Sequence, residues 1–145
     1  FAGSFSRQGK QLRGGYYIRI RPGESVVAGG FWEPNKEDLF RIRKEIEMDA
    51  EEMRTILKDE KFIHYFGGKF EGAELKSAPR GFDKAHPAID LLRKKGFVAV
   101  RKFTDQEVLA PNFISEVDQS FKALRPFFDY MSDVLTTNLN GESVL

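Results

Sequence analysis

The sequence predicts an α+β fold, in which an antiparallel sheet carries helices packed mainly on one face. Two observations lead to this class. Apolar and polar side chains alternate over residues 16–21 and again over 97–103, which is typical of half-buried strands. Apolar residues recur at steps of three and four from 114 to 135, which gives a helical segment one continuous apolar face. The 145 residues suffice for a single domain over 1–145.

The first expected element is a β-hairpin. Residues 1–15 show neither the alternation typical of a strand nor the apolar spacing typical of a helix, so we expect a loop there. In the strand that follows, Tyr16, Ile18 and Ile20 form an apolar face, while Tyr17 and Arg19 lie on a polar one. The dipeptide Pro22-Gly23 predicts a turn into a second strand over 25–32.

Two glycines inside the second strand call for a structural reason. Gly29 and Gly30 weaken a strand, because they bring no side chain to pack. Such a pair indicates a β-bulge or a close approach of another part of the chain. We therefore expect at least one of them to have a positive φ or a close neighbour.

Three short helices are expected next, each after a residue suited to capping: Asn35, Asp49 and Asp59. The charged side chains on their outer faces are interpreted as solvated helix surface. A third strand follows over 96–103, and Thr104 can cap a helical turn after it.

The last expected element is the long helix with the apolar stripe from Ile114 to Leu135, which should pack on the apolar face of the hairpin. Pro126 interrupts its backbone hydrogen bonding, so a kink or a restart is expected there. The stripe keeps its phase across Pro126, which favours a kink. Residues 136–145 are expected to form a frayed tail.

The segment APRGFDKAHPAIDLL, residues 78–92, holds several side chains that could serve chemistry. His86 lies near Arg80 and Asp83 in sequence and could act as a tunable acid or base. Pro87 suits the first position of a helix, which explains the local sequence without chemistry. We favour a mainly structural role for His86, with Asp83 close enough to bond or orient its ring.

The charges suggest a place for an anion. Residues 1–23 carry five basic side chains and no acid, and residues 91–104 carry five more and no acid. A mixed solvated surface is the simpler interpretation, but the two basic segments could also meet in space. The candidate ligand-binding residues are Tyr17, Arg19, Arg80, Asp83, His86 and Arg101.

Several functional classes lack support. The two histidines have no second ligand at metal-site spacing, and no phosphate-binding glycine motif is present, so we expect neither metal nor cofactor. The isoelectric point near 8.1 is low for a dedicated nucleic-acid binder, so we do not expect that partner. The absence of cysteine and of a long apolar run favours a soluble, cytoplasmic protein without a membrane partner.

Three segments in combination resemble one family: GGYYIRIRPGESVVAGGFWEP, APRGFDKAHPAIDLLRKKGFVAVRKF and FKALRPFFDYM. They are similar to the domain of unknown function 2461, from Phe1 to about Met131. The resemblance implies a further helical segment and a basic strand upstream of Phe1, so we expect this chain to be the C-terminal portion of such a protein. It implies no activity, substrate or catalytic residue.

Two hypotheses about function follow. The polar sheet face could hold a small anionic ligand, in a binding module or in an enzyme whose reaction and catalytic residues the sequence does not indicate. Alternatively, the chain is a structural or protein-interaction domain without a small-molecule site. Converging arginines on a concave polar sheet face would favour the first hypothesis, and a flat, exposed apolar patch the second.

Overall fold

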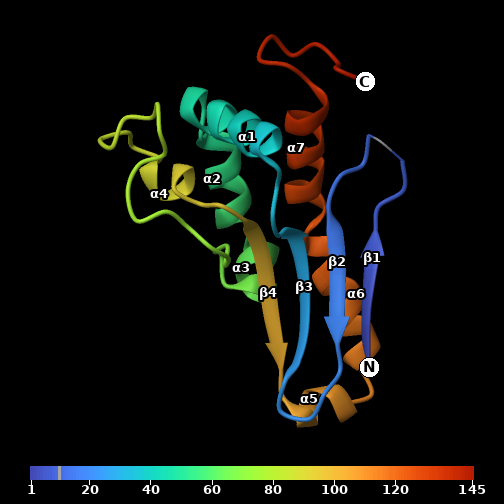
Figure 1. Cartoon of the computed structure of the whole chain (residues 1–145). Coiled ribbons are helices and arrows are strands. Elements are labelled where there is room, and N and C mark those ends of the chain that lie inside the picture. The colour runs from blue at the N-terminus through green and yellow to red at the C-terminus, as the bar shows by residue number, and fades with distance from the viewer. Residues whose placement is uncertain (10) are drawn as a thin grey trace.

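The computed structural model describes residues 1–9 and 11–145, and it confirms the α+β class (Figure 1). Four antiparallel strands lie in the order β1-β2-β3-β4. They span Ala2–Ser6, Gly15–Arg19, Ser25–Phe31 and Phe97–Phe103. The hairpin predicted from Pro22-Gly23 is β2-β3, and Gly23 has the positive φ of 74° that this turn requires.

The expectation of a loop over residues 1–15 was wrong for its first part. Ala2–Ser6 forms β1, which pairs with β2 so that Gly3 faces Ile18 and Phe5 faces Tyr16. β1 is an edge strand made of small and polar residues apart from Phe5, so it has no apolar alternation to detect. Its pairing with β2 is therefore a tertiary contact without a local sequence signal.

Seven helices of the described residues complete the fold, and three of them begin at caps that the sequence predicted, whereas Asp49 is the C-cap of α1 and α2 begins without a side-chain cap. Asn35 and Asp59 accept hydrogen bonds at the starts of α1 and α3, as predicted, and Thr104 forms a capping box at α5. None of these helices is long and apolar enough to cross a bilayer. Their bounds are α1 Lys36–Met48, α2 Glu51–Lys58, α3 Glu60–Phe66, α4 Ile89–Leu92, α5 Asp105–Leu109, α6 Phe113–Ala123 and α7 Arg125–Thr136.

The helix α6 and the first turn of α7 cover one face of the sheet, as the apolar stripe predicted, and the rest of α7 continues beside α1 (Figure 1). The Tyr16 ring of β2 lies 4.8 Å from the Phe121 ring and 4.9 Å from the Phe128 ring, between centroids. Ile18 joins a smaller apolar cluster with Phe113. Ile114, which the stripe included, is instead 74% exposed, since its neighbour Phe113 turns inward.

The predicted kink at Pro126 is a complete break between two helices. α6 ends before Leu124, and α7 begins at Arg125 with Pro126 in its first turn. Leu124 keeps a right-handed helical backbone, which is why the apolar stripe stays in phase across the break. A proline lacks the N–H that would continue the ladder, and it is well tolerated in a first turn.

The glycine pair of β3 is a site of close approach, as predicted. A Cβ at Gly30 would lie 2.1 Å from the carbonyl oxygen of Phe97, and Gly30 has a φ of 151°. A Cβ at Gly29 would lie 2.3 Å from a methyl carbon of Leu124. The strand register is continuous, so no bulge is involved.

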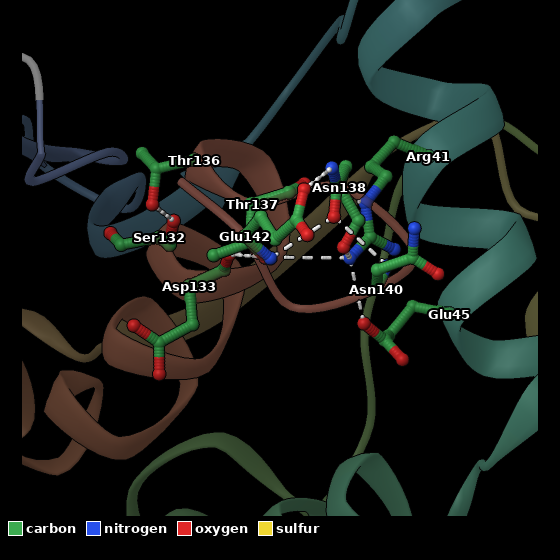
Figure 2. Close-up of polar contacts among 9 residues, drawn as sticks. All are labelled: Arg41, Glu45, Ser132, Asp133, Thr136, Thr137, Asn138, Asn140 and Glu142. Atoms are coloured by element: carbon green, nitrogen blue, oxygen red, sulfur yellow. Dashed lines mark hydrogen bonds and ion pairs between the residues drawn. The ribbon is translucent and has the colours of Figure 1, made fainter. Parts of the chain in front are cut away.

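The C-terminal segment forms a turn rather than a frayed tail. Thr137 bridges to Ser143, and the Asn138 and Glu142 side chains are hydrogen-bonded. The guanidinium of Arg41, on α1, donates to the backbone carbonyls of Thr137 and Asn138 (Figure 2). These contacts hold the turn at the junction of α1 and α7.

The close approach at the glycine pair predicts an order of mutational effects. Gly30→Ala should lower the free energy of unfolding by about 1–3 kcal/mol or more, because its Cβ meets backbone at an unfavourable φ. Gly29→Ala should cost less, since the Leu124 side chain can move. Gly3→Ala, on the edge strand, meets only ordinary contacts and serves as the control. Urea unfolding measures all three, and equal values for Gly30→Ala and Gly3→Ala would contradict this account.

Candidate functional site

The sheet face opposite α6 and α7 is covered by no helix of the described residues, and we call it the open face (Figure 1). Strand pairing arranges its residues in rows across the sheet. One row runs Ala2, Arg19, Val26 and Lys102. The next runs Ser4, Tyr17, Ala28 and Val100. The last runs Ser6, Gly15, Gly30 and Val98.

A hollow lies at the β1-β2 end of the open face. It has a volume of about 350 Å³ and is bordered by Tyr17 and Trp32, with serine hydroxyls from β1. Trp32 lies beside Gly15, and a Cβ on this glycine would meet the indole ring at 3.9 Å, an ordinary contact distance. Trp32 is the single tryptophan of the chain and is 46% exposed. The lining residues are Ser4, Phe5, Ser6, Gly15, Tyr16, Tyr17 and Trp32.

Two cations of this face have no acidic partner among residues 1–9 and 11–145. Arg19 and Lys102 lie in the same row on either side of Val26. The Arg19 Nε donates to the carbonyl oxygen of Glu24 at 2.8 Å, which holds the stem of the side chain. Neither cation forms an ion pair with an acid of residues 1–9 or 11–145. The three rows themselves contain no acid, so their electrostatic potential is positive.

Arg101 does not belong to the open face, which corrects the expectation that it could join Tyr17 and Arg19 there. It pairs with Val27 and points toward α6, where its guanidinium donates to Ser120 at 2.8 Å and to Glu116 at 3.2 Å. The same group lies 4.4 Å from the centroid of the Phe103 ring. Arg101 is thus an anchor between β4 and α6, and its neighbour Lys102 faces the open side.

The other three candidates lie in a loop far from the sheet face. Figure 1 shows this loop in yellow-green, beyond α1 and α4 and away from β1 and β2. Arg80 and Asp83 are exposed, and Asp83 accepts from the backbone N–H of Ala85 rather than from the His86 ring. Tyr17 and Arg19 therefore share a surface, but Arg80, Asp83 and His86 do not join them.

His86 uses both ring nitrogens within the fold. Nε2 donates to the carbonyl oxygen of Glu47 at 3.0 Å, and Nδ1 accepts from the N–H of Ala88 at 3.0 Å. The first bond fastens the loop to α1, and the second satisfies a backbone donor just before α4. This geometry supports the structural role inferred from Pro87, through backbone groups instead of Asp83.

A second hollow, of about 290 Å³, is lined by four bases and two acids, and three of the bases pair with these acids. Arg54 donates two hydrogen bonds of 2.7 Å to Asp90, and this bonding holds the pKa of the Asp90 carboxyl below its usual range. Arg93 and Lys94 both pair with Glu74. An anion would have to compete with these carboxylates for three of the four bases, so this hollow is less suited to a small anion than the open face.

The comparisons with known proteins bear on the family. A family model described as "Conserved hypothetical protein (DUF2461)" matches residues 1–130. The chain belongs to this family. The match covers almost the same range as the resemblance noted from the three segments. No curated protein and no solved structure matches the chain.

The sequence pattern missed part of the open face. Ser4 and Ser6 entered the site only with β1, which had no detectable pattern. Trp32 and Lys102 were visible as an exposed aromatic and a base next to the predicted strands, but their face depends on the register. The alternation along residues 97–103 separates Lys102 from Arg101, but only the pairing of β4 with β3 shows which of them shares a face with Arg19.

The hydrogen bonds of the His86 ring predict that replacing this residue lowers the stability of the protein. His86→Gln should cost about 1 kcal/mol, the contribution of a typical hydrogen bond, because one backbone partner is lost. His64→Gln is the control, since His64 is exposed on α3, and it should change stability by less than about 0.5 kcal/mol. Chemical denaturation measures both. An unchanged stability for His86→Gln would refute the structural role.

Proposed function

We propose that this protein is a binding module that holds a small anionic ligand on the open face of its sheet. The observation that carries this proposal is the row containing Arg19 and Lys102, two cations without acidic partners among the described residues, beside the hollow at Tyr17 and Trp32. A concave surface with a few polar groups and aromatic walls is typical of small-molecule sites.

The strand geometry suggests how such a ligand would lie. Arg19 and Lys102 are two strands apart, about 9–10 Å between backbones, so both long side chains can reach one anionic group above Val26. The Tyr17 row lies two residues along the strands, about 7 Å away. A ligand with an anionic end and a flat apolar body would therefore contact the cations and the aromatic hollow together.

The proposal assigns binding and no reaction. His86 has both ring nitrogens engaged with backbone groups, so it does not supply a base to this face. We place the binding in the cytoplasm, the compartment that a chain without cysteine favours. The alternative is a protein-interaction domain, for which the exposed Trp32 and the half-buried Val26 and Val100 on the same face provide a surface.

Trp32 gives a direct test, because the single indole lines the hollow. We expect phenyl phosphate and benzoate to change its fluorescence in a saturable way, and neutral benzyl alcohol to do so more weakly. Lys102→Gln and Arg19→Gln should each weaken the binding of phenyl phosphate about tenfold, the factor that corresponds to a lost charge-assisted contact. Fluorescence titration measures these affinities.

The control variant is Lys61→Gln, an exposed lysine of α3 with the same change in net charge. It should leave the affinity within about twofold of the parent, because at physiological salt a distant exposed charge is screened. An equal loss of affinity for phenyl phosphate in all three variants would show nonspecific electrostatic attraction instead of a binding site. Absence of any saturable change, together with self-association through Trp32, would favour the interaction domain.

A further inference from the structure

A group of carboxylates surrounds a buried tyrosine hydroxyl where α1, α2 and α7 meet. The hollow there has a volume of about 140 Å³. Its lining residues are Glu45, Asp49, Glu52, Tyr130, Asp133, Val134 and Thr137. This place lies at the end of α7 and is separate from the open face of the sheet.

Tyr130 distinguishes this group from solvated helix surface. Tyr130 is only 6% exposed, and its hydroxyl is buried without a hydrogen-bond partner among the described residues. A buried hydroxyl without a partner costs free energy, so most such groups in proteins are bonded. Burial raises the pKa of Tyr130, and the nearby charges of Glu45, Glu52 and Asp49 raise it further. The phenol therefore stays neutral and can accept a hydrogen bond.

The carboxylates are only partly compensated by bases. Glu45 pairs with Arg41 at 2.9 Å, in the contacts that Figure 2 shows between α1 and the end of α7. Asp49, Glu52 and Asp133 have no ion pair with a base in residues 1–9 or 11–145. The hollow is therefore negative, and its occupant should be a cation that can donate a hydrogen bond to Tyr130.

The geometry favours an organic cation over a bare metal ion. No three carboxylate or imidazole groups of the described residues are grouped closely enough to hold a metal. The hollow of about 140 Å³ also exceeds the ~30 Å³ share of one water molecule. An alkylammonium group has three N–H donors, which can be divided between the Tyr130 oxygen and the carboxylates.

We propose that this hollow binds the ammonium group of a small alkyl amine, whose three N–H groups donate to the Tyr130 hydroxyl oxygen, to the Glu52 carboxylate and to one of the carboxylates of Asp49 and Asp133. Glu45 adds negative potential while its pairing with Arg41 fixes the wall of the site. Glu45 lies on α1, Asp49 directly after it, Glu52 on α2 and Asp133 on α7, so binding would link these three helices.

The test uses 1,4-diaminobutane as the probe and ¹H–¹⁵N NMR of the complete chain as the readout. At constant ionic strength, we expect saturable shifts confined to the end of α1, the start of α2 and the end of α7. Tyr130→Phe should weaken binding about tenfold, yet the unliganded variant should be at least as stable as the parent, because an unbonded hydroxyl has been removed. This combination separates lost recognition from lost folding.

Glu52→Gln and Glu51→Gln form a matched pair, since both carboxylates lie in the first turn of α2 but only Glu52 lines the hollow. Glu52→Gln should weaken binding about tenfold and Glu51→Gln by less than about twofold. Equal effects of the pair, or no saturable shift at millimolar diamine, would overturn the proposal. Tighter binding of Ca²⁺ or Mg²⁺ with the same shifts would overturn it in favour of a metal site.

Discussion

Close packing at the glycine pair of β3 sets how the neighbouring strand and the helices meet the centre of the sheet. Leu124 is fully buried at the break between α6 and α7, and its methyl group occupies the space that a side chain at position 29 would need. Burial of such a leucine contributes roughly 1.5–3 kcal/mol. The same strand carries Gly30, whose missing side chain lets β4 approach closely. The helix α6 and the first turn of α7 can therefore lie directly on the sheet.

This packing divides the sheet into two faces with different roles. On the covered face, Tyr16 lies between Phe121 and Phe128, and even the cation Arg101 is used to hold α6. The other face has no helix over it in the part of the chain that the structure describes. Its polar and aromatic residues are thus available to a ligand because the apolar requirements of the fold are met on the opposite side.

The sequence predicted those features that depend on local patterns. The hairpin, the caps at Asn35 and Asp59, and the close approach at the glycine pair all follow from residue types at fixed spacing. Features that depend on pairing were not predictable in the same way. β1 has no apolar alternation, and the face of Arg101 depends on the register of β4 against β3. An error of one position in that register exchanges Arg101 with Lys102.

The candidate site shows the same contrast between features that follow from the local sequence and features that depend on contacts between distant segments. Tyr17 and Arg19 could be placed on one face because they lie two residues apart on one strand. Arg80, Asp83 and His86 are also close in sequence, but they belong to a loop that the His86 ring fastens to α1, away from the sheet face. Glu45, Asp49 and Glu52 look like ordinary helix surface, since their shared environment is created by Tyr130, about 80 residues away in the chain. Long-range packing, and not residue type, brings this group together.

Cysteine labelling tests the division of the sheet most directly, because the chain contains no native cysteine. Val100→Cys and Ala99→Cys place a thiol on adjacent residues of β4, on the open face and the covered face respectively. The account predicts rapid reaction of Cys at 100 with a thiol reagent in the native protein. For Cys at 99 it predicts a thiol that does not react in the native protein and reacts once urea has unfolded the chain. Protection at both positions would show that the open face is covered and would contradict the account.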